Sequence, residues 1–291
     1  MFRKSVLAIA ISVITLFSLS GSAWASAGKP VTVTLFAAKS LNSVMEELIP
    51  AYEKAHPGVK IVGSYDSSGT LMQQIEEGAA ADLFFSAAQK QMNELEEKGF
   101  VVDGTRADVV NNQVCVVTYK NSGTSVTGLK DIAKAANLAL ADGSVPVGKY
   151  TRQALVNADL LPDYVAAKEK EGVKKEDIDA SLITTEEVSE ALGGIEINEC
   201  ANVGAVTAAV AEGSNEVGTV YRSDLYGHEK ELEILEIVPY DLTGNVIYPV
   251  AQIVNPEADE AEEAAAKAFA EYLTTDEAKA VFEKYLFDTD V

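Results

Sequence analysis

Apolar and polar positions follow one another along the chain in two patterns: short unbroken apolar runs, and longer segments with a helical period. The runs at 31–36, 59–62 and 82–85 have the length and composition of buried strands. Between the first two runs, residues 41–52 place apolar side chains at offsets 0, 3, 4, 7, 8 and 11, which is one face of an α-helix. The strand–helix order, repeated three times, predicts a parallel sheet with helices on both faces.

Two of the strand-to-helix turns carry hydroxyl groups. Ser40 stands where the N-cap of the first helix belongs, and Ser67 and Ser68 precede a second helix that begins at Thr70. Ligands of such sheets bind beyond the carboxyl ends of the strands, where helix N-termini converge. Ser40 and Ser68 are therefore candidate binding residues, although for either serine alone an ordinary N-cap is the simpler interpretation.

The same alternation returns in the second half of the chain. Residues 160–198 are highly charged, and we interpret them as a solvated helical excursion. The apolar segment 114–119 is a candidate for a strand that crosses between two lobes. Further strands are expected at 138–141, 218–221 and 247–254, with helices from 146, over 203–210 and over 257–286.

This order predicts an α/β protein of two lobes, one built from both ends of the chain and the other from its middle. We expect lobe I to contain residues 29–112 and 247–291, and lobe II to contain residues 113–246. Two hinge strands, near 111–114 and 246–249, would join them.

The first 25 residues have the features of a signal peptide. Arg3 and Lys4 precede an apolar stretch, and small residues at Ala23 and Ala25 form the pattern that signal peptidases cleave. We expect cleavage near Ala25, with Ala27 as a second possible position and an N-terminal membrane anchor as the competing interpretation. Neither cysteine lies near these positions, so we expect a free periplasmic protein without a lipid anchor.

Composition and charge exclude several classes of function. The chain has 23 Lys and Arg against 45 Asp and Glu, a net charge of −22, and loss of the leader's two basic residues would make it −24. Nucleic acids and anionic membranes bind clustered basic residues, so neither is an expected partner. A small anion would be repelled as well, unless local donors outweigh the overall charge.

The chain offers little material for an enzyme or a metal site. His56 and His228 are its only imidazoles, and no nucleophile elbow, phosphate loop, dinucleotide motif or zinc motif is present. Acidic clusters lack the spacing of a calcium loop, so we expect neither a metal-cation site nor a cofactor. Cys115 and Cys200 could pair in an oxidising compartment, which the sequence leaves open. An exported thiol enzyme that uses them is the alternative from another functional class, although no general base accompanies either thiol.

Neutral groups at helix starts are the chemistry that remains. A helix N-terminus presents unpaired N–H groups and a partial positive charge, and together these hold an anion. A serine at such a start adds another donor. A site of this kind binds an anion without Lys or Arg and selects it by size and by donor geometry.

Six short motifs occur along the chain in order: Phe36–Leu41, Ser64–Leu71, Gly78–Ala87, Val145–Gly148, Gly218–Asp224 and Tyr248–Val250. Together they resemble the periplasmic molybdate-binding proteins of ABC transporters, and they span nearly all of the chain after the leader. Each motif alone is weak, but six in one order are specific. The resemblance implies a type II periplasmic binding protein, with two α/β lobes joined by two hinge strands that close over the ligand.

The resemblance also implies which residues hold the oxyanion. Carried onto this chain, the donors are the hydroxyls of Ser40 and Ser68, the backbone N–H groups of Val147 and Val203, and the hydroxyl of Tyr221. The segment before Val203 is longer than is usual in the family, which blurs the register there.

The function implied is capture of molybdate, and tungstate with it, for delivery to a membrane permease by a monomer that is not an enzyme. Sulfate, thiosulfate or another small oxyanion on the same scaffold is the nearest alternative. Asp82 and Asp224 belong to the motifs in structural roles. Lys39 could add charge near the site, although a side chain in solvent is its simpler interpretation.

Overall fold

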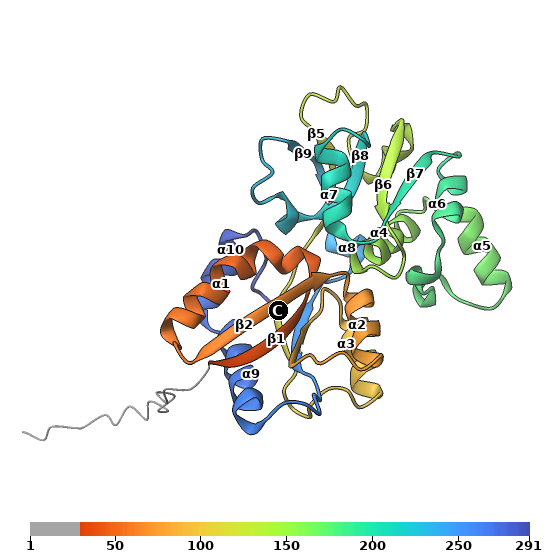
Figure 1. Cartoon of the computed structure of the whole chain (residues 1–291). Helices are drawn as coiled ribbons and strands as arrows, with labels where there is room; N and C mark the ends of the chain where they lie inside the picture. The colour runs from red at the N-terminus through yellow and green to blue at the C-terminus, as the bar shows by residue number, and fades with distance from the viewer. Residues whose placement is uncertain (1–29) are drawn as a thin grey trace, which may run out of the picture.

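Two five-stranded sheets, each covered by helices, form two lobes in the computed structural model, which describes residues 30–291 (Figure 1). The predicted leader peptide and its cleavage near Ala25 lie outside these residues. We call the body built on the first sheet lobe I and the body built on the second sheet lobe II. The exact residues at which the lobes divide stay a prediction.

The sheet of lobe I has the strand order β2-β1-β3-β10-β4. Alternate residues of its first strand pack on opposite sides: Val33 and Leu35 join the cluster that contains the first helix, and Phe36 joins the cluster beneath the second and third helices. The elements of this lobe are β1 (Val31–Ala38), η1 (Lys39–Leu41), α1 (Asn42–Ala55), β2 (Val59–Asp66), α2 (Ser68–Glu76), β3 (Leu83–Phe85), α3 (Gln89–Glu97), β4 (Ala107–Val110), β10 (Tyr248–Gln252), α9 (Glu260–Leu273) and α10 (Asp276–Lys284).

The sheet of lobe II has the strand order β7-β6-β8-β5-β9. The charged segment 160–198 is helical only in part, because it contains two helices, two short 3-10 turns and the first residues of a strand. The elements of this lobe are β5 (Val114–Tyr119), η2 (Leu129–Lys134), β6 (Asn137–Ala141), α4 (Pro146–Asn157), α5 (Pro162–Lys170), η3 (Lys175–Asp177), η4 (Ala180–Leu182), α6 (Thr185–Ala191), β7 (Glu196–Cys200), α7 (Val203–Ala211), β8 (Val217–Tyr221), η5 (Arg222–Leu225), β9 (Leu232–Ile237) and α8 (Tyr240–Thr243).

Both sheets are mixed: the predicted parallel pairing is confirmed for the first three strands, β1, β2 and β3, but it does not extend over the whole of either sheet. In lobe I, β1 pairs in parallel with β2 and β3, whereas β10 is antiparallel to β3 and β4. In lobe II, β6 pairs in parallel with β7 and β8, whereas β5 is antiparallel to β8 and β9. The reason is the connection between the lobes. β5 and β10 each begin just after a crossing and run away from the cleft, whereas the strands beside them, β8 and β3, run toward the cleft and end at it.

The chain crosses between the lobes twice, and the two crossings are hydrogen-bonded to each other. The first crossing is the stretch between β4 and β5, so the prediction that 114–119 itself crosses is wrong: that strand lies entirely in lobe II. Asn112 N donates to Val246 O (3.1 Å), and Val246 N donates to Asn111 Oδ1 (2.8 Å). These bonds tie the two crossing segments into one hinge.

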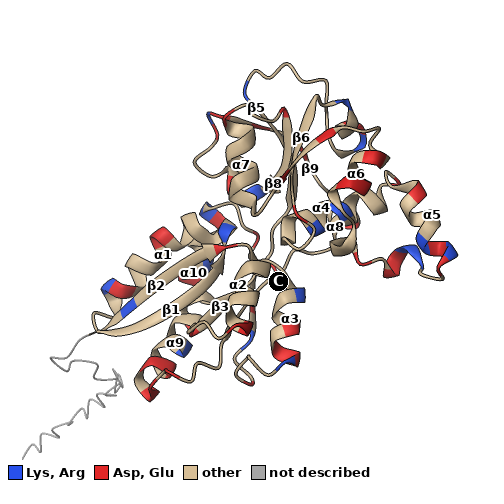
Figure 2. Ribbon diagram, turned by 45° about the vertical axis from the view of Figure 1, so that its right-hand side comes forward, with Lys and Arg blue, Asp and Glu red and all other residues tan. Residues whose placement is uncertain are grey.

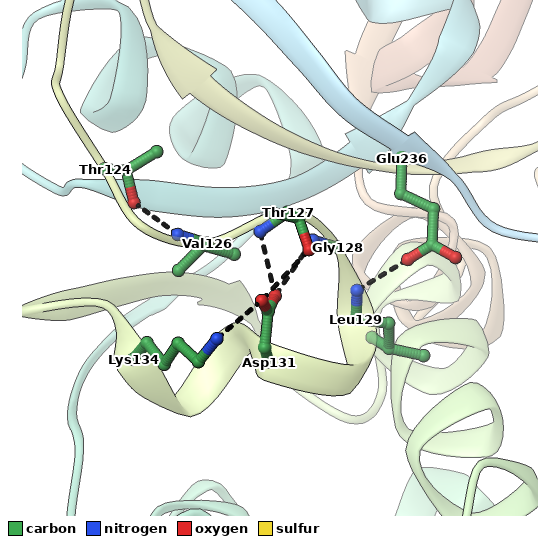
Figure 3. Close-up of polar contacts among 8 residues, drawn as sticks. All are labelled: Thr124, Val126, Thr127, Gly128, Leu129, Asp131, Lys134 and Glu236. Carbon is green, nitrogen blue, oxygen red and sulfur yellow. Dashed lines mark hydrogen bonds and ion pairs between the residues drawn. The ribbon is translucent and has the colours of Figure 1, made fainter.

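Charged side chains lie mainly on the outer helices, such as α3, α5 and α9 (Figure 2). The turn before η2 shows how carboxylates satisfy backbone donors at the surface (Figure 3). Asp131 accepts from Thr127 N (2.8 Å) and Gly128 N (3.1 Å), and Glu236 accepts from Leu129 N (2.6 Å). No helix within residues 30–291 is long and apolar enough to span a bilayer.

Candidate functional site

A small cavity lies between the lobes, at the carboxyl ends of strands from both sheets. Figure 1 shows β1 and β2 running toward lobe II, and the cavity is lined by residues at or after the ends of β1, β2 and β3 and of β6, β7 and β8. The structure brings together all five residues that the sequence singled out. That they bind a ligand stays a prediction. The cavity is lined by Ala38, Lys39, Ser40, Ser67, Ser68, Ala87, Val145, Pro146, Val147, Val203 and Tyr221.

The size of this cavity restricts what it can hold. Its volume is about 10 Å³, close to that of one water-sized sphere. Pockets for organic ligands are far larger, about 300–1,000 Å³. A cavity of about 370 Å³ lies elsewhere in lobe I, but its lining has three carboxylates (Asp82, Glu260 and Glu263) against one ammonium group (Lys267), which disfavours an anion. The cavity between the lobes therefore suits a compact solute.

Neither Ser40 nor Ser68 is an N-cap, contrary to the simpler interpretation of each. The cap of α2 is Ser67, whose hydroxyl accepts from Thr70 N (3.1 Å). Ser68 is the first residue of that helix and is fully buried, and its Oγ accepts from Ala87 N (2.9 Å). Because this bond uses a lone pair, the hydroxyl hydrogen of Ser68 stays available to a ligand.

Ser40 lies in the 3-10 turn η1, between β1 and α1, and is also buried. The cap position of α1 is Leu41, which makes no side-chain capping bond. Ser40 Oγ instead lies 2.9 Å from Tyr248 Oη. Asn112 Nδ2 of the hinge donates to Tyr248 Oη (3.1 Å) and to Ser223 Oγ of lobe II (2.8 Å). This network holds Ser40 in place and connects it to the hinge.

The hydroxyl of Tyr221 lacks a hydrogen-bond partner among the described residues. Its Oη is buried at the end of β8 beside the cavity. A buried polar group without a partner costs about 1–3 kcal/mol. Burial raises the pKa of Tyr221, and that of Tyr248 behind it, well above the usual value, so both phenols are neutral. Tyr221 is therefore a donor that a bound acceptor would satisfy.

Val147 and Val203 contribute backbone donors from the first turns of two helices. Val147 follows Pro146, the first residue of α4, and Val203 is the first residue of α7. First-turn N–H groups have no partner inside their own helix. In residues 30–291 no turn, loop or side-chain acceptor meets either N–H. Asn202 caps α7, but its side chain accepts from Ala205 N (3.0 Å) and leaves Val203 N free.

The residues that line the cavity differ in charge from the chain as a whole. No carboxylate lines it, and Lys39 is the cation among its lining residues. Lys39 is half-buried, not simply in solvent, and its aliphatic stem lies against Gly204 of α7. It also lines a neighbouring cavity of about 240 Å³ between the lobes, which Asp224 and His228 share.

The remaining sequence predictions have mixed outcomes. Asp82 and Asp224 have structural roles as expected: Asp82 accepts from Thr34 N (2.7 Å), and Asp224 accepts from Tyr221 N (2.9 Å). Cys115 and Cys200 are free and buried, so they form no disulfide. Burial raises the pKa of Cys115 to about 12 and also raises that of Cys200. These shifts are the opposite of what a thiol nucleophile needs.

Tyr248, Asn112 and Ser223 are residues near the site that the sequence interpretation missed. The motif Tyr248–Val250 could have pointed to Tyr248, because it is one of the six motifs that carry the resemblance, although the sequence alone assigns this tyrosine no role. Asn112 and Ser223 carry no comparable signal, since their meaning depends on the contact between lobes.

Comparison with known proteins places the chain in a family. Residues 33–288 match the family model described as bacterial extracellular solute-binding protein. The chain is 32% identical to the molybdate-binding protein ModA of Escherichia coli (strain K12) over 93% of each sequence. It is 30% identical to YvgL of Bacillus subtilis (strain 168), named as a putative ABC transporter substrate-binding lipoprotein, over 100% of each.

Structural comparison gives the same fold. The sulfate-binding protein SubI of Mycobacterium tuberculosis superposes with a TM-score of 0.68 at 18% identity, over 89% of this chain and 88% of that one. The predicted fold class, a periplasmic binding protein of two α/β lobes, is confirmed. The chain therefore belongs to the bacterial extracellular solute-binding proteins, which capture solutes and are not enzymes.

Proposed function

We propose that this protein is the solute-binding component of an ABC transporter, that it captures molybdate, and tungstate with it, between its lobes, and that it delivers the oxyanion to a membrane permease. The observation that carries the proposal is the buried Tyr221 hydroxyl without a partner among the described residues, which faces the same cavity as the open N–H groups of Val147 and Val203. The names of the Escherichia coli relative and of the family model support the same class of function.

The donor set favours an anion that only accepts hydrogen bonds. Molybdate at neutral pH carries no proton, so each of its oxygens can take an N–H or O–H from the protein. Phosphate keeps a proton near neutral pH and needs an acceptor, and no carboxylate lines the cavity. Hydrogen bonds to a charged ligand contribute about 1.5–3 kcal/mol each, so five donors suffice without a direct cation.

Closure would follow from how the donors divide between the lobes. Ser40 and Ser68 belong to lobe I, whereas Val147, Val203 and Tyr221 belong to lobe II. An oxyanion meets all five only when the lobes are together, so it stabilises the closed form. A tetrahedral oxyanion is larger than one water, and we expect the lobes to separate slightly around it.

A thermal-shift screen with molybdate, tungstate, sulfate, thiosulfate and phosphate tests the proposal. A ligand at about 1,000 times its dissociation constant adds about 4 kcal/mol to the free energy of unfolding. Molybdate and tungstate should raise the melting temperature most. A shift with phosphate alone, or no shift with any of the five anions, would overturn the proposal.

Sulfate is the second candidate, and the small volume of the cavity favours it because sulfate is the smaller tetrahedral anion. The fold shared with a sulfate-binding protein is compatible with either ion. Titration calorimetry separates the two candidates. Molybdate should bind at least tenfold more tightly than sulfate, and the reverse order would reassign the ligand.

A further inference from the structure

The charged segment 160–198 of lobe II reaches across the cleft to lobe I. Lys90, the second residue of α3, donates from Nζ to Asp179 Oδ2 (2.9 Å) and to Ser181 Oγ (2.7 Å). Its neighbour Gln91 approaches Ser144 O of lobe II (3.4 Å). The charged segment 160–198 therefore supplies a polar contact between the lobes.

The turn that Lys90 contacts is organised in advance. Asp179 Oδ1 accepts from Ser181 N (3.0 Å) and from Ser181 Oγ (2.6 Å), which orients both oxygens that Lys90 uses. Although burial by itself raises the pKa of Asp179, hydrogen bonds from Ser181 and Lys90 lower it to about 2. The carboxylate is therefore ionised at every pH at which the protein would work, and it needs little rearrangement to bind the ammonium.

This turn is also packed onto the loop that carries the candidate donors. A Cβ added to Gly143 would lie 2.5 Å from Ser181 O, so only glycine permits the approach. Gly143 stands between β6 and the start of α4, a few residues before Val147. The Asp179–Ser181 turn therefore packs directly against the loop between β6 and α4, which leads to the candidate donor Val147.

A buried arginine fixes the segment to the same loop. Arg152 of α4 is fully buried and donates to Ile183 O (2.7 Å), Ala141 O (2.7 Å) and Gly148 O (3.1 Å). These acceptors belong to the segment, to the end of β6 and to the first turn of α4. Within lobe II, the loop that carries the candidate donors and the Asp179–Ser181 turn are therefore fixed to each other, and Lys90 of lobe I binds to this turn.

We propose that the contact of Lys90 with the Asp179–Ser181 turn, which we call the clasp, holds the lobes together across the cleft. The clasp lies outside the binding site, and it sets how long the solute stays bound. The contact exists only when the lobes are together, so its free energy stabilises the closed form and not the first encounter. Exposed ion pairs usually contribute little. Here the Lys90 side chain is only partly exposed, and the Asp179 carboxylate is oriented before the lobes meet.

The first test measures molybdate kinetics, a readout that rests on the proposed function. Lys90→Gln and Asp179→Asn should each raise the dissociation rate about two- to fivefold and should not lower the association rate. The amide oxygen introduced by Asp179→Asn would still accept from Ser181 N, so the turn survives the change. The control is Lys98→Gln, which removes the ion pair with Glu76 inside lobe I (2.6 Å) and should alter neither rate.

The second test needs no solute, so it separates failure of the clasp from failure of the proposed function. Labels on cysteines introduced at the exposed positions Lys54 of lobe I and Glu212 of lobe II report the distance between lobes, and the native cysteines are buried. Ligand-free Lys90→Gln and Asp179→Asn proteins should open more often than the parent and the Lys98→Gln control. An unchanged distance distribution in both variants would overturn the clasp, and so would dissociation rates equal to the parent's.

Discussion

Two sets of backbone donors in lobe II are treated in opposite ways. At the surface turn before η2, the N–H groups of Thr127, Gly128 and Leu129 all meet carboxylate oxygens, from Asp131 and Glu236 (Figure 3). At the cleft, the N–H groups of Val147 and Val203 meet no acceptor in the described part of the chain. Both sets lie at the starts of helical turns, where the backbone leaves donors unpaired.

The difference shows that the donors in the cleft are not left unpaired because the chain lacks capping residues. The chain has 45 acidic residues, and several of its helix starts are capped by Asp or Thr, as at α6, α9 and α10. No carboxylate lines the cavity. A carboxylate placed there would occupy the donors and repel any anion, so the acidic surface and a cavity without carboxylates belong to one arrangement.

Placing a carboxylate in the cleft should make it resemble the surface turn, and of the changes considered it should lower the affinity for the anion most. Ser40→Asp puts a negative charge beside the cavity, and two unit charges 4 Å apart repel by about 4 kcal/mol at an effective dielectric constant near 20. We expect molybdate affinity to fall more than a hundredfold. Ser40→Asn, which has the same shape without the charge, should lose much less. Similar losses in both variants, measured by calorimetry, would contradict the electrostatic reason.

Tyr221→Phe should come next. Removing one hydroxyl donor to a charged ligand costs about 1.5–3 kcal/mol, a ten- to hundredfold loss of affinity. The melting temperature of the ligand-free protein should not fall, because the hydroxyl has no partner to lose among the described residues. A drop in that temperature together with unchanged affinity would show that Tyr221 is structural.

Asp131→Ala is the converse change at the surface turn. It leaves the N–H groups of Thr127 and Gly128 without acceptors, and we expect the melting temperature to fall by about 2–4 °C. Molybdate affinity should be unchanged. Loss of affinity in this variant would mean that the two regions are coupled.

Lys39 should change how fast the anion arrives. Lys39→Gln should lower the association rate of the anion about two- to fivefold at low ionic strength, because Lys39 lines both cavities between the lobes and its charge attracts the anion. The difference should vanish near 1 M salt, where the screening length is about 3 Å. Lys54→Gln, at the far end of α1, removes the same charge and should have no such effect. Equal effects of the two changes, measured by stopped flow, would assign the steering to net charge alone.

Asp224 should affect how stability depends on pH. Burial raises its pKa to about 7, although Tyr221 N donates to it. Its pKa in the unfolded chain is about 3.9, so the folded protein binds more protons between about pH 4 and pH 7, and stability falls as pH rises through that window. Asp224→Asn keeps an acceptor for Tyr221 N. Its melting temperature relative to the parent should rise from pH 4 to pH 8, and a flat difference would contradict the raised pKa.

The strands that sequence patterns missed share one position in the fold. β4, β7 and β9 are edge strands, and each leaves part of its length exposed. An edge strand is half solvated and often carries charged residues, so these three lack the apolar run by which the other strands, including the edge strand β2, were found. β7 reads Glu-Ile-Asn-Glu-Cys, which resembles a loop when the sheet is not known.

The sequence by itself determined the alternation of strands and helices, the turns at which donors gather, and the acidic surface, because periodicity and charge are local properties of the chain. Only the tertiary structure decided that Ser67 caps its helix while Ser68 faces the cleft, since the two hydroxyls are chemically alike and adjacent. The choice depends on Ala87 N, which the end of β3 brings to Ser68. The missing partner of Tyr221 within the described residues and the contact of Lys90 with lobe II are likewise relations between segments distant in sequence, which no local pattern encodes.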